Sequence, residues 1–231
     1  TFEDASLANA TLGALASKVI AFDQLPMAAT TLTGSQIQQL ANDANVISIY
    51  RNAPLQYSNY TSGQITSGHY VHDNYGVYGE GVTIAVLDSG VDASHPDLAL
   101  GDKTVENVKI VGDLGLLGGV NLFVEGVLNS DTTSGHGTHV AGTTAGDGTA
   151  SANDARRANY MAGIAPKAKI VGLGAGEGIS ILYALLGFEY AIANQERLDI
   201  DIITNSWGGG DGSEFDPYDP INVASFMAYK K

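Results

Sequence analysis

The segment GVTIAVLDSGV, residues 81–91, constrains the fold of this chain more than any other part of its sequence. Its core from Val82 to Leu87 is almost continuously apolar, as expected of a strand that is buried on both faces of a sheet. A helical segment lies between two further strand-like segments, and in chain order the three are AKIVGLGAG (168–176), SILYALLGFEYAIAN (180–194) and DIDIITNSW (199–207). Ser180 is expected to cap the helical segment. Strands that alternate with helices predict an α/β fold, in which flanking helices cover a parallel sheet.

Residues 1–57 differ from the rest of the chain in having short periodicities and few glycines. The elements expected there are a helix within residues 4–15, strands at Val19–Phe22 and within 27–33, a short helix at 34–44 and a half-buried strand at 45–52. Ser35 and Gln38 stand at the capping-box positions of the second helix. The pattern predicts a small α+β unit ahead of the parallel sheet.

Residues 53–70, APLQYSNYTSGQITSGHY, are polar and rich in Ser, Thr, Gly and Tyr. Such a composition is typical of a linker that leads into a new folded unit. The expected division of the chain is therefore a first unit of residues 1–57 and a second unit of residues 58–231.

Composition excludes several classes of function. The 231 residues include 25 acidic and 11 basic side chains, which gives a formal net charge of −14. Nucleic-acid binding needs a basic surface, so a nucleic-acid partner is not expected. Cysteine is absent, which excludes disulfides, thiol catalysis and thiolate metal sites. No segment approaches the roughly 18 consecutive apolar residues that a membrane span needs.

Asp88 directly follows the first strand, and in open parallel sheets ligands and chemistry lie beyond the carboxyl ends of the strands. A carboxylate at a buried strand end is costly unless it has partners. One interpretation is a structural cap that accepts loop amides; the other is a carboxylate that orients a histidine. His136 is the natural partner for the second role, because it stands at the start of a predicted helix that Ser134 would cap.

His136 and His139 are three residues apart in the segment TSGHGTHVAGTTAG, residues 133–146. A structural interpretation is a small-residue helix that packs tightly against a neighbour, with both histidines satisfied by hydrogen bonds. A metal pair is disfavoured because the segment lacks the Glu of the HExxH pattern and the chain lacks Cys. A metal-dependent hydrolase that uses Asp88, His136 and His139 nevertheless stays as an alternative.

Three segments resemble the subtilisin-like serine peptidase family, and they occur in that family's order: AVLDSGVDASHPDL (85–98), SGHGTHVAGT (134–143) and ITNSWGGG (203–210). Residues 18–57 are also similar to the later part of that family's inhibitory propeptide. The resemblance implies a subtilisin-like parallel sheet, incomplete in this chain, preceded by a small α+β propeptide domain. It also implies a secreted serine endopeptidase that hydrolyses peptide bonds in proteins through an Asp-His-Ser triad.

The resemblance implies roles for individual residues. Asp88 matches the triad aspartate and His136 the general base, whereas His139 matches a non-catalytic, packed helix residue. In such a triad a neutral imidazole takes the proton of the serine hydroxyl, and the carboxylate fixes its tautomer and stabilises the imidazolium. Five residues match segments that pair with the substrate backbone, namely Gly176, Gly178, Ser206, Trp207 and Gly208.

Asp97, in the segment SHPDL, matches a position that often binds calcium in the family. The resemblance therefore implies a structural calcium ion as a cofactor. The other interpretation of Asp97 is an ordinary loop or turn aspartate.

The family's serine nucleophile lies in a GTSMA-like segment and its oxyanion asparagine in an AAGN-like segment, and neither occurs in residues 1–231. We expect this chain to be the Asp- and His-bearing portion of a zymogen, inactive by itself. Its expected partners are a protein or peptide substrate, its own propeptide as inhibitor, and the remaining C-terminal half of the peptidase. A catalytically dead peptide-binding module is the alternative.

The tail of an inhibitory propeptide has to lie in the active cleft as a product would, so it should be extended and uncharged. Residues 52–63 carry no charged side chain, and Pro54 disfavours helix at the residue before it. Tyr57 would supply an aromatic group for the substrate pocket, and the small Ser58 would follow the cut. We expect processing between Tyr57 and Ser58, with Tyr60–Thr61 as second choice.

Overall fold

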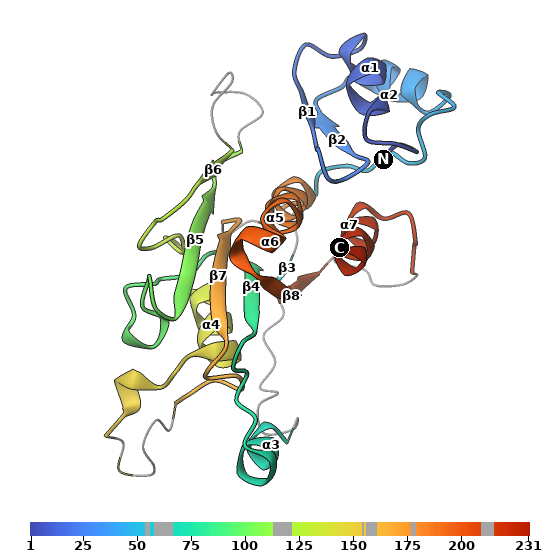
Figure 1. Ribbon diagram of the computed structural model, residues 1–231. Coiled ribbons are helices and arrows are strands. Elements are labelled where there is room, and N and C mark those ends of the chain that lie inside the picture. The colour runs from blue at the N-terminus through green and yellow to red at the C-terminus, as the bar shows by residue number, and fades with distance from the viewer. Residues whose placement is uncertain are drawn as a thin grey trace.

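The computed structural model describes residues 1–53, 56–57, 67–112, 122–153, 155, 161–176, 179–208 and 215–231. Figure 1 shows a small N-terminal unit, residues 1–53, at one end of a larger sheet domain, which comprises the described residues from 67 onward. A short strand, β3 (Gln56–Tyr57), lies between them in the sequence. The chain ends in helix α7, beside the helices that follow the sheet's central strands.

The N-terminal unit is built from two helices and one hairpin, in the order α1 (Leu7–Gly13), β1 (Val19–Ala21), β2 (Ala28–Thr30) and α2 (Gly34–Leu40). Its own hydrophobic cluster is formed by Phe2, Ala8, Leu12 and Leu40, which are all buried. The helix expected within residues 4–15, the two short strands and the second helix are therefore present, and the unit is α+β in composition.

The predicted capping box of α2 was wrong by two residues. Thr33, not Ser35, is the N-cap: its backbone is extended and its hydroxyl accepts the amide of Gln36, whose own side chain accepts the amide of Thr33. Ser35 lies inside the helix because α2 begins at Gly34. The residue types of a capping box recur here at overlapping positions, so the sequence pattern alone did not select the right pair.

The strand expected at residues 45–52 does not form. Val46 makes an isolated bridge to Phe2, and the amide of Ile47 donates to the carbonyl of Thr1. Ile47 and Ile49 are exposed rather than half-buried. The alternating pattern is present, but no described strand lies alongside this segment to complete a ladder.

The sheet domain contains a five-stranded sheet in the spatial order β6-β5-β7-β4-β8. In chain order the strands are β4 (Thr83–Asp88), β5 (Thr104–Ile110), β6 (Phe123–Val124), β7 (Lys169–Gly174) and β8 (Ile200–Thr204). All neighbouring pairs are parallel except β5 with β6. The predicted parallel sheet with flanking helices is confirmed, with one antiparallel edge strand added.

Helices α4 (His136–Ala145) and α5 (Ile181–Ala193) lie on opposite faces of this sheet, because they pack in two different hydrophobic clusters. In Figure 1, α3 (Gly68–Tyr75) lies beyond one end of the sheet, α6 (Gln195–Leu198) follows α5, and α7 (Pro220–Lys230) packs beside α5. Along β4, Ala85 and Leu87 pack in the cluster that includes α5, whereas Ile84 and Val86 pack in the cluster that includes α4. Strand β4 is thus buried on both faces, and its carboxyl end lies between two helix layers.

Strand β5 was not predicted, because its sequence TVENVKI mixes apolar with polar and charged residues. Asn107 in its centre is fully buried, donating to the carbonyl of Val91 and accepting the hydroxyl of Ser130. Because these buried polar residues form hydrogen bonds to distant parts of the chain, a search for runs of apolar residues does not detect the strand.

Helix α3 begins inside the segment that was expected to be linker, residues 53–70. Among the described residues, no helix combines the length and the apolar character needed to cross a bilayer.

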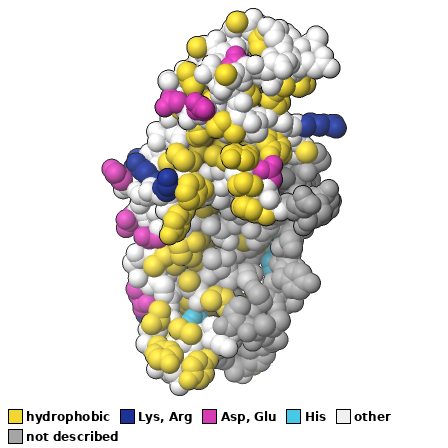
Figure 2. Space-filling view, turned by 90° about the vertical axis from the view of Figure 1, so that its right-hand side faces the viewer, with side chains coloured by type: hydrophobic (Ala, Val, Ile, Leu, Met, Phe, Trp, Pro, Cys, Tyr) yellow, Lys and Arg dark blue, Asp and Glu magenta, His cyan; other side chains and the backbone are white. Residues whose placement is uncertain are grey.

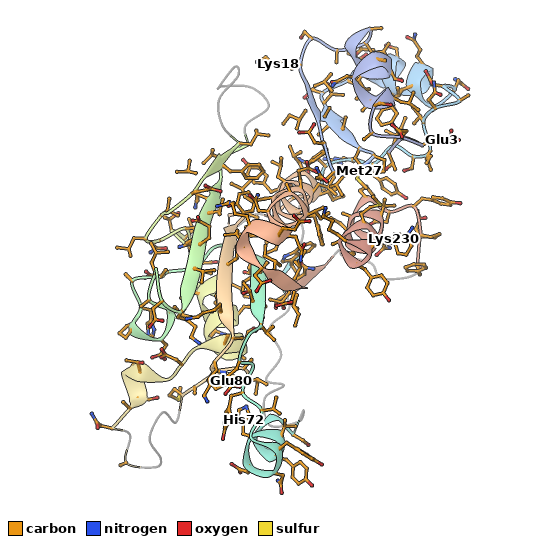
Figure 3. All side chains as sticks on the ribbon, viewed as in Figure 1. Glu3, Lys18, Met27, His72, Glu80 and Lys230 are labelled. Atoms are coloured by element: carbon orange, nitrogen blue, oxygen red, sulfur yellow. The ribbon has the colours of Figure 1, made fainter. Side chains whose placement is uncertain are left out.

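The N-terminal unit packs against α5 through its hairpin side. Phe22, Leu25 and Met27 are buried in the same cluster as the helix, and Figure 3 shows Met27 at the edge of the unit that faces α5. A cavity of about 570 Å³ remains along this seam, lined from both parts. Figure 2 shows hydrophobic side chains gathered across the middle of the face on which α7 lies.

The start of α5 is not capped in the way the sequence predicted. Ser180 is the N-cap residue by position, but its hydroxyl accepts no helix amide. The amide of Leu182 donates instead to the Asn52 side chain (2.9 Å), and the amide of Ile181 donates to the carbonyl of Ala53 (3.2 Å). The N-terminal unit therefore supplies the cap of a helix in the sheet domain.

Candidate active site

Asp88 is the last residue of β4 and its side chain is fully buried. One carboxylate oxygen, Oδ1, accepts the Nδ1–H of His136 at 2.7 Å and the amide of Ser89 at 2.7 Å. The strand carries the carboxylate to the edge where the sheet's other parallel strands also end. The structure thus brings together the two residues that the sequence singled out.

His136 opens helix α4, and its side chain is 14% exposed. The predicted cap, Ser134, is not the N-cap. Gly135 takes that position with φ at 75°, and it has no side chain to offer the helix. The first-turn amide of Thr138 donates instead to Asp131 Oδ2 at 3.0 Å, so a carboxylate upstream of the helix acts as its cap.

Glycine at position 137 lets α4 approach the loop after β4 backbone to backbone. A Cβ atom on Gly137 would lie 2.2 Å from the carbonyl oxygen of Gly90 and 3.0 Å from Asp88 Cβ. Gly90 has φ at 140°, a conformation that favours glycine. The two glycines set the distance between the element that carries Asp88 and the element that carries His136.

Burial raises the pKa of the Asp88 carboxyl, and the hydrogen bonds from His136 and Ser89 oppose this shift. The negative charge of Asp131 adds to the rise. The pair therefore consists of a desolvated carboxylate that is held in place by an imidazole N–H and a backbone N–H. Such a carboxylate fixes one imidazole tautomer and stabilises a positive charge on the ring.

His139 is exposed, one turn along the helix from His136. The expectation that it is a packed residue was wrong, because the buried face of α4 is formed by Gly137, Val140, Ala141 and Ala145. Within the part of the chain that the structure describes, no group of three or more His, Asp or Glu side chains is arranged to hold a metal. The donor set that a metal-dependent hydrolase would need from Asp88, His136 and His139 is not assembled.

Strand β9 (Trp207–Gly208) lies beside the end of β4, because Trp207 Nε1 donates to the carbonyl of Leu87 at 2.7 Å. It pairs antiparallel with β3, in the register Gln56 with Gly208 and Tyr57 with Trp207. Ser206 immediately precedes this strand. The segment singled out for substrate binding therefore accepts an extended backbone from elsewhere in the chain.

Gly176 follows β7 with φ at 83°, and its amide donates to the carbonyl of Ser89 at 3.3 Å. It lies next to the loop that begins with Asp88. Gly178, the other glycine assigned to this side, and Ser58, assigned to the processing junction, both lie outside the described residues.

Asp97 is buried in a short helical turn, and its Oδ1 accepts the amide of Ala150 at 2.6 Å. Calcium takes about six to eight oxygen ligands in proteins. Around Asp97, no cluster of three or more acidic or histidine side chains occurs among the described residues. Calcium at Asp97 therefore stays a prediction.

Two neighbours of the pair, Ser89 and Asp131, were not singled out from the sequence. Ser89 follows Asp88 directly, and Asp131 lies in the loop before α4. One sequence feature could have indicated Asp131. The N-cap residue of α4 is Gly135, which has no side chain to accept a first-turn amide, so another acceptor is needed nearby.

Comparisons with known proteins bear on this arrangement. A family model described as the subtilase family matches residues 79–230. The thermostable alkaline protease of Halalkalibacterium halodurans is 30% identical over 198 residues, which cover 83% of this chain and 46% of the relative. The major intracellular serine protease of Bacillus subtilis is 38% identical over 141 residues, covering 58% of this chain and 36% of the relative. The chain spans less than half the length of these curated relatives.

Among solved structures, fervidolysin from Fervidobacterium pennivorans, described as a keratinolytic enzyme related to subtilisin, superposes with a TM-score of 0.54 at 18% identity. The superposition covers 99% of this chain and 37% of that chain. At this identity the likeness concerns the fold alone.

The close approach at Gly137 yields a prediction with a control in the same helix. Gly137→Ala should destabilise the protein by about 1–3 kcal/mol, because its methyl group meets a backbone oxygen that cannot move aside. Gly142→Ala should be neutral or stabilising by up to about 1 kcal/mol, since nothing lies within 4 Å of its added methyl and alanine favours helix. Thermal unfolding of the two variants measures the difference, and equal stability would contradict the backbone contact.

Proposed function

The chain belongs to the subtilase family, and on that premise we propose that it is the portion of a serine endopeptidase that carries the catalytic aspartate, Asp88, and the catalytic histidine, His136. The observation that carries this proposal is the 2.7 Å hydrogen bond between the two side chains, at the carboxyl end of a buried parallel strand. The protein would hydrolyse peptide bonds in protein substrates.

The geometry supports a defined role for each member of the pair. The Asp88 carboxylate accepts the Nδ1–H of His136, which leaves Nε2 as the nitrogen that takes a proton from a nucleophile. When Nε2 is protonated the ring becomes positive, and the buried carboxylate stabilises that charge. We propose that the serine nucleophile comes from the C-terminal portion of the peptidase, consistent with relatives more than twice as long as their matched part.

We propose that substrates bind as an added strand on residues 206–208, with Gly176 and Gly178 on the opposite side. The pairing of β3 with β9 supports this, since it is the same kind of backbone pairing that an extended peptide would make. A site built on backbone groups selects weakly among side chains. The expected preference before the scissile bond is broad and apolar or aromatic, and the acidic surface disfavours acidic substrates.

Residues 1–57 are proposed to be an inhibitory propeptide. Two kinds of contact support this: docking on the sheet domain and occupation of the substrate strand. In the first, Glu189 of α5 accepts the amides of Asp23 and Gln24 at 2.9 and 3.0 Å. In the second, the tail residues 56–57 lie on β9. A product-like tail on the substrate strand would block access to His136.

The register of β3 on β9 supports a processing junction close to the candidate pair. Tyr57 pairs with Trp207, and Trp207 is anchored at the end of β4 next to Asp88. We therefore propose that the chain is processed between Tyr57 and Ser58, with Tyr60–Thr61 as the second choice.

Secretion and calcium binding belong to the same proposal. Of the two relatives compared above, one is named an intracellular protease, so relatives alone do not decide the compartment. A structural calcium ion near Asp97 would need ligands in addition to the described carboxylate. The alternative of a binding module without catalysis would use β9 equally well, but it gives no role to the Asp88–His136 hydrogen bond.

Activity should depend on one histidine of α4 and not on the other. In the full-length protein, His136→Ala should abolish hydrolysis of a chromogenic peptide, because it removes the imidazole that Asp88 holds to accept the nucleophile's proton. His139→Ala, an exposed residue on the same helix, is the matched control and should keep activity. Full activity of His136→Ala would refute the proposal, and inactivity of the wild type would favour the binding module.

The N-terminal sequence of the processed protein tests the junction. It should begin at Ser58, or at Thr61 for the second choice, and processing should fail in His136→Ala if it is autocatalytic. A start before Ala53 or beyond Gly68 would show that this segment is not the junction and would weaken the propeptide assignment.

The docking contact at Glu189 gives a pH-dependent prediction. Burial raises the pKa of this carboxyl, and the amide hydrogen bonds oppose the rise without reversing it. Taking the ordinary pKa of 4.5 for Glu189 in the undocked state, docking raises the pKa and therefore takes up a proton. The contribution of Glu189 to the free energy of docking is therefore fully present below pH 4.5, the ordinary pKa of a glutamate. It is lost as the pH rises through the raised pKa of the docked carboxyl.

After processing, the N-terminal unit should dissociate faster as pH rises from about 4 to about 7. Glu189→Gln keeps an acceptor for the amides but no charge, so its dissociation rate should vary less with pH. Glu196→Gln, which changes an exposed residue, should behave as wild type. Gel filtration of the cleaved protein at each pH gives the rates, and identical pH profiles for wild type and Glu189→Gln would contradict the assignment.

A further inference from the structure

Asp131 is a buried acidic residue, 7% exposed, in the loop before α4. Four donors point at its carboxylate. Oδ1 accepts the hydroxyl of Ser89 at 3.0 Å and the amide of Gly135 at 3.1 Å, and Oδ2 accepts the amide and the hydroxyl of Thr138 at 3.0 and 2.7 Å. Every one of these donors lies within three residues of Asp88 or His136 in the sequence.

Two of the donor residues flank His136 in the chain. Gly135 and Thr138 belong to the N-cap and the first turn of α4, whose amides have no partner within the helix. Because Gly135 cannot cap with a side chain, Asp131 provides the acceptor from outside the helix. The position of the first turn, and with it the position of the His136 ring, is tied to this carboxylate.

The third donor residue connects Asp131 to the other half of the pair. Ser89 Oγ donates to Asp131 and accepts the amide of Gly137 at 2.8 Å. The amide of Ser89 donates to Asp88 Oδ1. A continuous set of hydrogen bonds therefore runs from Asp131 through Ser89 to both Asp88 and the residue that follows His136.

Asp131 also brings a second negative charge to the site. Burial is the main cause of the raised pKa of Asp88, and the charge of Asp131 contributes to the same rise. Asp131 is therefore electrostatically coupled to the carboxylate that holds His136.

Resting on the proposed function, we propose that Asp131 is a positioning residue of the catalytic site, which holds the Asp88 loop and the first turn of α4 together through Ser89 and Thr138. It acts through Asp88 and His136 and does not itself contact the substrate. A merely structural aspartate would make the same bonds without affecting the turnover of folded enzyme.

The test compares two Asp-to-Asn variants of the full-length enzyme. Asp131→Asn keeps the size of the side chain but removes its charge. It also replaces one acceptor oxygen by an NH2 group, which cannot accept the hydrogen bonds that this oxygen accepted. Asp102→Asn makes the same change at a side chain that is 81% exposed. Steady-state kinetics with a chromogenic peptide, normalised to folded enzyme, separate kcat from KM.

For Asp131→Asn we expect kcat to fall about tenfold, which corresponds to about 1.4 kcal/mol in activation free energy, with little change in KM. Asp102→Asn should match the wild type in both kcat and KM. An Asp131→Asn enzyme with a lower melting temperature but unchanged kcat would overturn the proposal.

Ser89→Ala is a second test and serves if Asp131→Asn does not fold. It removes the hydrogen bonds to Asp131 and to the Gly137 amide while the Asp131 carboxylate remains, so kcat should fall with little change in KM. Unchanged kcat in Ser89→Ala would overturn the positioning role. Failure of the proposed function is distinguished from both results, since the wild type itself would then show no His136-dependent activity.

Discussion

A contact between backbones underlies the candidate site. The loop after β4, the loop before α4 and the first turn of α4 meet backbone to backbone at two glycines. A Cβ on Gly137 would lie 2.2 Å from the oxygen of Gly90, and a Cβ on Gly90 would lie 2.3 Å from the carbonyl carbon of Ser130. Backbone segments at this distance bury polar groups that have to be satisfied. Short polar side chains do so, with Ser89 and Asp131 accepting or donating at the centre. The hydrogen bond between Asp88 and His136 is a consequence of this packing.

The elements marked by runs of apolar residues could be predicted from the sequence. The elements whose buried polar groups find hydrogen-bond partners only in the folded chain could not. Strands β4, β7 and β8 and helix α5 are marked by such runs. Strand β5 is not, because Asn107 at its centre is buried only by virtue of its bonds to Val91 and Ser130. The expected strand at 45–52 failed for the opposite reason: it has the alternation, but no described strand pairs with it.

The same division applies to the site. Asp88 and His136 could be named because their residue types and positions, a carboxylate at a strand end and a histidine among glycines, carry the chemistry. Asp131 could not, because its role arises from the folding of a loop around a helix whose N-cap is glycine. Serines beside helix starts were assigned as N-caps, yet Gly135 takes that position in α4 and the Ser180 hydroxyl accepts no amide of α5. Ser134, one residue earlier, accepts the amide of His136 at 3.3 Å. The amides of Thr138 and Leu182 donate to side chains from upstream or distant segments, Asp131 and Asn52.

The N-terminal unit and the substrate strand are coupled through a short stretch of chain. Asn52 and Ala53 bind the first turn of α5, and Gln56 already pairs with Gly208 on β9. Three residues span about 10 Å when extended, so the docked position of the unit determines which tail residue meets Trp207. A ladder of two residue pairs is too short to be stable by itself. The tail is therefore held on β9 mainly because docking on α5 raises its local concentration there. If the chain is processed after Tyr57 as proposed, the lifetime of the tail on β9 would be set by the seam with α5, where Glu189 and the buried Leu25 and Met27 lie, rather than by the short ladder itself.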